Sequence, residues 1–223
     1  MNLSRRFLVT LFRGLSDAVF RVHAEALAGV PARGPLILVM NHINILEIPL
    51  IYSRLQPRPV HGLVLADHWK NPLIAWGLNA CGSIPIQRGE GNLASINKAL
   101  EVLSAGEIIL IMPEGTRSGD GQLQHARPGV VLLALKSKAP ILPIVTHGGE
   151  KYKDNLKKLR RTEFYICLGK PFTLKATNGT VDSLGRRQML DEMMYQLAAL
   201  LPPENRGVYA SLSGSTQDYL DFC

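Results

Sequence analysis

Residues 1–22 place apolar and polar side chains on opposite sides of a predicted helix. One side carries Phe7, Leu8, Leu11, Phe12, Leu15, Ala18 and Val19, and the other carries Arg5, Arg6, Thr10, Arg13, Ser16, Asp17 and Arg21. A cationic face opposite an apolar stripe is typical of a helix that lies in a membrane interface. The pattern also fits a surface helix that packs its stripe onto the domain, and one helix can do both along different edges. We therefore expect an amphipathic, membrane-surface helix over residues 1–22.

After this helix, short runs of isoleucine, valine and leucine alternate with stretches of helical period. The apolar runs lie at 35–40, 60–66, 83–86, 107–112, 140–146 and 163–168, and the helical stretches at 48–55, 72–80, 92–105, 129–138 and 183–201. Continuous apolar runs are expected of strands that are covered on both faces. The alternation predicts an α/β fold with a largely parallel central sheet flanked by helices.

The 223 residues are enough for one sizeable core, and no break in composition divides them. Residues 23–205 are therefore expected to form one domain. The polar segment 206–223 is expected to be a C-terminal arm, ordered only if Tyr209, Tyr219 or Phe222 docks. No uninterrupted apolar stretch reaches the roughly 20 residues needed to cross a bilayer.

The net charge of +7 favours an anionic partner such as lipid headgroups, a phosphorylated substrate or an acidic carrier protein. Nucleic acid is not expected, because aromatic residues make up only 6% of the chain and no recognised binding module occurs. Three cysteines without paired spacing indicate a reducing compartment, and neither they nor the histidines suggest a metal site. An export signal is disfavoured, since Arg13 interrupts the apolar stretch after Arg5 and Arg6.

The segment NHINILE places a histidine, His42, directly after a predicted strand and an acid, Glu47, five residues later. In a continuous helix these side chains would point about 140° apart. Pro49 favours a helix that begins near residue 47, because proline is tolerated in a first turn, so the residues between can form a loop that folds His42 back onto Glu47. A carboxylate that accepts from one imidazole nitrogen leaves the other free to take a proton. A polar loop histidine and an acid at a helix start are the structural alternatives.

Two further segments end strands in groups that suit an anion. In GSIPIQR a glycine precedes a strand and Arg88 leaves its far end; in MPEGTRS a strand runs into a turn with Glu114, Gly115, Thr116 and Arg117. Backbone amides, hydroxyls and guanidinium groups at the carboxyl ends of strands form an anion-binding cup. Each segment alone also fits an ordinary polar turn. The strand APILPIV reads as core, and Pro143 within it suggests an edge or irregular position.

Together, these four segments, in this order over about residues 36–147, resemble the signature motifs of the glycerolipid acyltransferases, including the lysophosphatidic acid acyltransferases. The second and third motifs fit residue for residue. The resemblance implies a glycerol-3-phosphate acyltransferase-like fold and acyl transfer from a thioester to the free hydroxyl of lysophosphatidic acid, giving phosphatidic acid. It also implies a role for each motif residue: His42 as the general base oriented by Glu47, Arg88, Glu114, Gly115, Thr116 and Arg117 as the phosphate site, and Pro143 and Ile144 as lining on the acyl side.

The hydroxyl would attack the thioester directly, without an acyl-enzyme or a cofactor. The donor would be acyl-coenzyme A or acyl-carrier protein. One departure is Glu47, since the family's first motif usually ends in aspartate. This change puts the predicted substrate in question more than the predicted chemistry, and it leaves room for a weakened enzyme. The basic segment 151–161 could meet anionic lipid or an acidic carrier protein. We expect a cytoplasmic protein, peripheral on the inner face of the cell membrane.

Three alternatives stay open at this stage. The chain could acylate another lysolipid. It could be a non-catalytic lipid-surface protein in which the altered dyad is inactive. More remotely, residues 89–94 fit the G-x-G-x-x-A pattern of dinucleotide-binding oxidoreductases, with Glu114 standing 25 residues after the first glycine. That interpretation leaves NHINILE unexplained.

Overall fold

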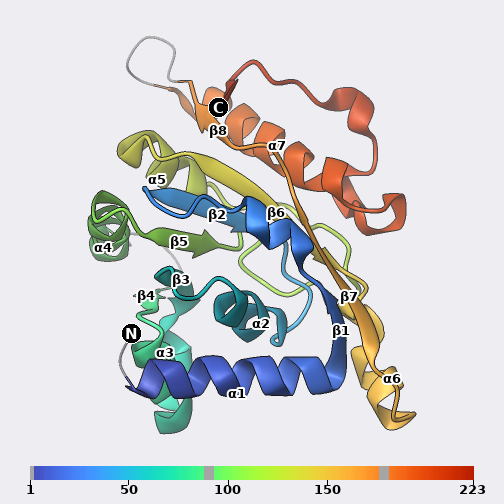
Figure 1. Ribbon diagram of the computed structural model, residues 1–223. Coiled ribbons are helices and arrows are strands. Elements are labelled where there is room, and N and C mark those ends of the chain that lie inside the picture. The colour runs from blue at the N-terminus through green and yellow to red at the C-terminus, as the bar shows by residue number, and fades with distance from the viewer. Residues whose placement is uncertain (1–2, 88–92, 176–180) are drawn as a thin grey trace.

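Within residues 3–87, 93–175 and 181–223, which this computed structural model describes, nine strands form one sheet (Figure 1). The strands are β1 (Phe20–His23), β2 (Leu36–Met40), β3 (Val60–Leu65), β4 (Ile84–Ile86), β5 (Ile108–Ile111), β6 (Ile141–His147), β7 (Thr162–Leu168), β8 (Phe172–Leu174) and β9 (Leu220–Phe222). Their order is β1-β7-β6-β2-β5-β3-β4, with β8 paired to β6 and β9 to β8. Strands β6, β2, β5, β3 and β4 are mutually parallel, whereas β7 and β8 join β6 antiparallel. The predicted α/β fold with a largely parallel sheet is confirmed.

Helices cover both faces of this sheet. They are α1 (Leu3–Val19), α2 (Glu47–Arg54), α3 (Pro72–Ala80), α4 (Leu93–Ser104), α5 (Gly129–Ser137), α6 (Tyr152–Lys157) and α7 (Ser183–Leu200). Strand β2 shows why its sequence is apolar throughout: Ile37 and Val39 pack with residues of α4, α5 and α7, and the alternate side chains Leu36, Leu38 and Met40 pack with residues of α1 and α2. All five are buried, as expected of a central strand between two helical layers.

Pro143 does not lie at a sheet edge, so that part of the sequence interpretation is wrong. It lies in β6, between β2 and β7, and opposite Val39 of β2. On the other side, pairing with β7 ends at Leu168, and β8 begins pairing at Phe172. The carbonyl of Pro143 accepts from the backbone N–H of Gly169 in this break, so its nitrogen, which lacks a hydrogen, faces the same break. The predicted irregularity is therefore an interruption inside the sheet.

Helix α1 has two apolar faces, where the sequence pattern suggested one. Leu8 and Val9 are buried, and Val9 packs in the core cluster that includes Leu50 and Ile51 of α2. A second stripe, Leu3, Phe7, Leu11 and Leu15, repeats every four residues and is exposed. The helix ends at Val19, earlier than expected, because Phe20 begins β1 and pairs with β7. Among the described residues, none of the helices combines the length and the apolar character needed to span a bilayer.

The C-terminal segment packs against α7 and joins the sheet. Glu192 of α7 is buried and accepts hydrogen bonds from Thr216 Oγ1 at 2.6 Å and from the backbone N–H groups of Asp218 and Tyr219 at 3.1 and 3.0 Å. Tyr209 is buried as well, and Leu220 begins β9. A buried carboxylate with several donors holds this polar segment in place, which its composition alone does not predict.

Candidate functional site

The side chains of His42 and Glu47 meet at the end of β2. Nδ1 of His42 lies 3.2 Å from Oε1 of Glu47, the imidazole is 14% exposed and the carboxylate is fully buried. Helix α2 begins at Glu47, with Pro49 in its first turn, so residues 42–46 form the expected loop. In the described part of the chain, Nε2 of His42 has no hydrogen-bond partner, so it is the nitrogen available to a substrate.

The carboxylate of Glu47 is fixed by two further donors. Oε1 also accepts a very short hydrogen bond from the backbone N–H of Asn44, and Oε2 accepts from Thr146 Oγ1 at 2.9 Å. Thr146 is fully buried in β6, and its backbone exchanges two hydrogen bonds, of 2.8 and 2.9 Å, with the side-chain amide of Asn41. Glu47 is therefore held by the loop that precedes it and by β6, which is distant in sequence, and sequence reasoning missed Thr146 and Asn41.

Glu114 lies on the other side of His42 and supports its backbone. Oε1 of Glu114 accepts from the backbone N–H of His42 at 2.8 Å, and Oε2 accepts from the N–H of Gln124 at 3.0 Å. The carbonyl of His42 in turn accepts from the N–H of Ser118 at 2.8 Å. The first and third motifs are thus joined directly, and both oxygens of Glu114 are used in holding loops.

Burial raises the pKa of Glu114 to about 7, and the nearby carboxylates of Glu47 and Asp120 add to the rise. The two backbone N–H donors act in the opposite direction, because they stabilise the charged form. Glu114 is only 3% exposed, so loss of hydration is the dominant effect. A group that joins the two loops therefore titrates near neutral pH.

The loop after β5 presents exposed groups around Gly115. Gly115 has φ of +66°, and Thr116 and Arg117, which follow it, are exposed. A Cβ at Gly115 would lie 2.8 Å from Nε of Arg127, an exposed side chain that can shift, so the left-handed backbone is the reason that this position needs glycine. The backbone N–H of Arg127 also donates to the carbonyl of Pro113. Arg127 is therefore a cation beside the predicted phosphate site, and sequence reasoning missed it. Arg88 and the glycines of the dinucleotide-type pattern lie outside the described residues.

The glycine of the second motif, Gly82, is needed for a close approach. It has φ of +68°, and a Cβ there would lie 2.7 Å from Nδ1 of His61. The imidazole of His61 pairs with the carbonyl of Gly82 and with Oε2 of Glu107, each at 2.7 Å. This histidine thus ties the turn that leads into β4 to the start of β5.

Pro143 and Ile144 lie in the strand that supplies Thr146, and their side chains are buried. Ile144 packs with Leu50 and Ile51 of α2, on the face of the sheet that carries Thr146, whereas Pro143 lies on the opposite face. The contact of either residue with an acyl chain stays a prediction. His147, at the end of β6, stacks on Tyr165 with ring centroids 4.9 Å apart. Burial lowers the pKa of His147, which fits a neutral ring in a stack.

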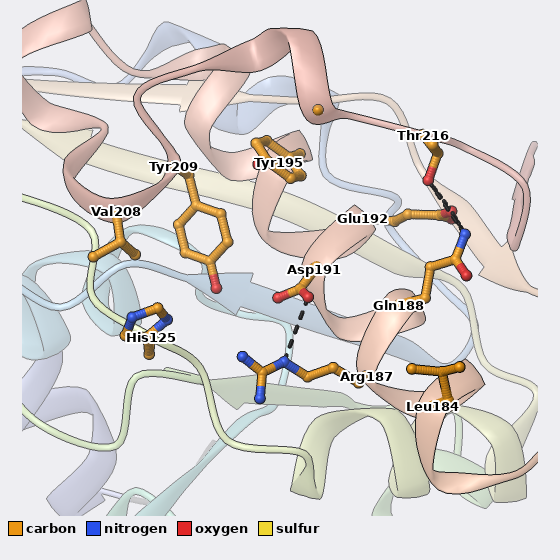
Figure 2. Close-up of a pocket in the computed structure, with 11 residues that line it drawn as sticks. His125, Leu184, Arg187, Gln188, Asp191, Glu192, Tyr195, Val208, Tyr209 and Thr216 are labelled. Carbon is orange, nitrogen blue, oxygen red and sulfur yellow. Dashed lines mark hydrogen bonds and ion pairs between the residues drawn. The ribbon is translucent and has the colours of Figure 1, made fainter.

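A cavity of about 480 Å³ lies away from these residues, between α7 and the C-terminal segment (Figure 2). It is lined by residues that include His125, Arg187, Asp191, Tyr195 and Tyr209, and by none of the predicted site residues. His125 follows Gln124, the residue that donates to Glu114, so the cavity is adjacent to the third motif's supporting loop and separate from the dyad.

Replacing Glu114 with glutamine should change how stability depends on pH. The pKa of Glu114 in the folded protein, about 7, is above its ordinary value of 4.5, so the fold favours the protonated acid. The resulting stability is complete below pH 4.5 and is lost as the pH rises through 7. The free energy of unfolding of the wild type minus that of Glu114→Gln should therefore fall by about 2 to 4 kcal/mol from pH 4 to pH 8. Urea unfolding at several pH values measures this difference; a rise with pH would mean that the backbone donors outweigh burial.

Comparisons with known proteins agree with this architecture. The family model Acyltransferase matches residues 21–147, more than half of the chain. The chain is 26% identical over 149 residues to the chloroplastic 1-acyl-sn-glycerol-3-phosphate acyltransferase LPAT1 of Arabidopsis thaliana, covering 65% of this chain and 41% of the relative. It is 31% identical over 144 residues to the lyso-ornithine lipid O-acyltransferase of Pseudomonas aeruginosa, covering 64% of this chain and 52% of the relative. It thus spans about half the length of these relatives.

Among solved structures, the fold is similar to that of the 1-acyl-sn-glycerophosphate acyltransferase PlsC from Thermotoga maritima. The TM-score is 0.59 at 21% sequence identity, covering 84% of this chain and 77% of that one. The matched region of the family model contains β2, the dyad, the loop after β5 and β6. The chain belongs to the Acyltransferase family.

Proposed function

We propose that this protein transfers a fatty acyl group from an acyl thioester to the free hydroxyl of lysophosphatidic acid, giving phosphatidic acid. The observation that supports this most directly is the imidazole of His42, held by the buried carboxylate of Glu47. The hydrogen bond from Ser118 to the carbonyl of His42 ties the dyad to the loop that carries Thr116 and Arg117. A base and an anion-binding loop in one place are what an anionic alcohol substrate requires.

In the proposed reaction, Nε2 of His42 takes the proton of the acceptor hydroxyl while the hydroxyl oxygen bonds to the thioester carbonyl carbon. The carbon–sulfur bond then breaks, and the sulfur leaves with its electron pair. The imidazolium returns the proton to that sulfur, so the products are an ester and a free thiol. The negative charge of Glu47 stabilises the imidazolium between these steps, and no acyl-enzyme forms.

The phosphate of the acceptor would bind the loop at Gly115, with Thr116 and Arg117 as side-chain donors and Arg88 as a second cation proposed from sequence. A planar guanidinium pairs well with phosphate oxygens. We assign Glu114 a supporting role, because its oxygens already accept from two backbone N–H groups.

The acceptor is an amphiphile, so we also propose that the protein works at an anionic membrane surface, on the cytoplasmic inner face of the cell membrane. The exposed stripe Leu3, Phe7, Leu11 and Leu15 of α1 supports this contact. Acyl-coenzyme A and acyl-carrier protein present the same thioester to His42, and either donor suits the proposed chemistry.

Another lysolipid acceptor is the second candidate. The 31% identity to a lyso-ornithine lipid O-acyltransferase supports it, and an ornithine headgroup also offers a carboxylate for a guanidinium. Assays with lysophosphatidic acid and lyso-ornithine lipid side by side decide between these acceptors.

Removing the base should stop acyl transfer. His42→Ala should lower turnover of lysophosphatidic acid and acyl thioester by about 10²- to 10⁴-fold, the usual contribution of a general base, while circular dichroism stays unchanged. Release of free thiol and formation of phosphatidic acid are measured together with both donors. His68→Ala, which removes an exposed histidine, is the matched control. Equal thiol release by wild type and His42→Ala would refute the enzymatic proposal.

Thr146 should act through Glu47. Thr146→Val keeps the shape but removes the donor to Oε2, so the buried carboxylate loses a charged hydrogen bond, about 1.5 to 3 kcal/mol. We expect turnover per folded protein to fall roughly tenfold to hundredfold with little change in KM, and Thr146→Ser to restore it. A purely structural role would instead lower the melting temperature without changing turnover of the folded fraction.

Arg117 should matter for the phosphate. Arg117→Ala should raise KM for lysophosphatidic acid by roughly tenfold to hundredfold, the effect of losing one charged hydrogen bond of about 1.5 to 3 kcal/mol. Turnover of a monoacylglycerol, which lacks phosphate, should not change. Arg186→Ala removes an exposed arginine on α7 and serves as control. Equal loss with both acceptors would contradict phosphate binding by Arg117.

A further inference from the structure

We propose that the connection between β6 and β7 forms a second contact with anionic membranes, in which Leu159 enters the lipid. We call residues 151–161, which include α6, the α6 tip. The proposal extends the proposed function, since it adds a surface that would orient the dyad toward a membrane-borne acceptor. It rests on the backbone at Leu159, the charges around it and the position of the tip beside α1.

Leu159 occupies a position that normally takes glycine. Its φ is +53°, and it follows the end of α6, where the N–H of Leu159 donates to the carbonyl of Leu156 and the N–H of Arg160 donates to that of Asn155. Helices that end in this way usually place glycine in the left-handed conformation, because a Cβ there is strained. Leu159 therefore adopts a backbone conformation that is strained for a residue with a Cβ.

Leu159 makes almost no packing contacts that could offset the strain of its backbone. Its side chain is 95% exposed, and Leu156 beside it is 50% exposed. A strained backbone that holds a fully exposed leucine has no stabilising role inside this chain. Lys138 has the same backbone conformation, so what distinguishes Leu159 is a large apolar side chain that is almost fully exposed, and an apolar partner outside the chain would cover it.

The charges of the α6 tip fit an anionic surface. Five exposed basic residues surround the two leucines: Lys151, Lys153, Lys157, Lys158 and Arg160. The single acid of the segment, Asp154, lies 3.8 Å from Lys157 and is also exposed. In such an arrangement the cationic side chains of lysine and arginine contact the anionic headgroups, and the protruding leucines reach the acyl region of the bilayer.

The tip lies against the carboxyl end of α1. The guanidinium of Arg161 donates to the carbonyl of Phe20 at 2.7 and 3.2 Å, and the rings of Phe20 and Tyr152 are 6.0 Å apart. Figure 1 shows α1 along one edge of the molecule, with α6 at the same edge beyond the end of α1. Helix α1, which carries the exposed stripe, and the α6 tip therefore lie along one edge of the protein.

This arrangement favours lipid over a protein partner. Helix α1 alone is about 25 Å long, and α3, which packs beside it, exposes Leu73, Ile74 and Trp76. Exposed apolar side chains are thus spread over three elements, α3, α1 and the α6 tip. A small acidic carrier protein would cover only part of that edge.

Leu159→Gly separates a membrane contact from a structural role. Glycine relieves the strain at φ +53°, so the melting temperature should stay the same or rise. Partition into vesicles of mixed phosphatidylcholine and phosphatidylglycerol should weaken roughly tenfold, as expected for one leucine that no longer enters lipid. Partition measured by cosedimentation that is unchanged in Leu159→Gly overturns the proposal.

Lys138→Gly is the matched control. Lys138 has φ of +54° and ends α5, which covers the opposite face of the sheet from α1. The same backbone change there should leave vesicle binding unaltered, although it also removes a charge. An equal loss in both variants would mean that the change in backbone, rather than the leucine, matters.

Two further measurements distinguish the partners and the proposals. If Leu159→Gly weakens binding to a purified acidic acyl carrier protein but not to vesicles, the tip is a protein-docking site and the membrane proposal is wrong. Turnover of a short-chain, vesicle-free acceptor should be the same in wild type and Leu159→Gly. Absence of turnover in both would refute the acyltransferase proposal, while the vesicle result stands by itself.

Discussion

The buried carboxylate of Glu47 is the interaction on which the site depends. It is fully buried, so it requires donors in place of water, and it takes them from the side chain of His42, the backbone of Asn44 and the hydroxyl of Thr146. These donors come from the loop after β2 and from β6, the strand next to it. Satisfying one charge therefore fixes the ring of His42 relative to the centre of the sheet.

A second buried acid extends this constraint to the phosphate side. Glu114 follows β5, which pairs with β2 on the side away from β6, and it accepts from the backbone of His42. The histidine is thus held through its ring by Glu47 and through its main chain by Glu114. Burial of Glu114 raises its pKa, and the nearby charge of Glu47 adds to the rise. Tight placement of the base and titration near neutral pH are two results of one arrangement.

The sequence predicts local features well and long-range ones poorly. Pro49 correctly indicated a helix starting at Glu47 and a loop that lets His42 turn back. Thr146 stands 99 residues from Glu47, and only the strand order that puts β6 beside β2 makes it a donor. The same holds for Pro143, which reads as an edge residue until the break between β7 and β8 is known. The sequence did not predict strand β9. The segment before it is held by the buried carboxylate of Glu192, which is distant in sequence and cannot be recognised as a partner from local patterns.

Residues with positive φ differ in whether their amino-acid type suits the backbone conformation. At Gly82 and Gly115 the backbone is left-handed and the residue is glycine, and a Cβ there would lie within 3 Å of a side chain, that of His61 or Arg127. Sequence, backbone and packing agree at both positions, as expected where the fold itself sets the requirement. Leu159 has the same backbone, but the residue opposes it and the surroundings are open. Lys138 is also left-handed and exposed, so the proposed lipid contact depends on Leu159 being an almost fully exposed leucine among basic residues, on the edge where α1 and α3 also expose apolar side chains.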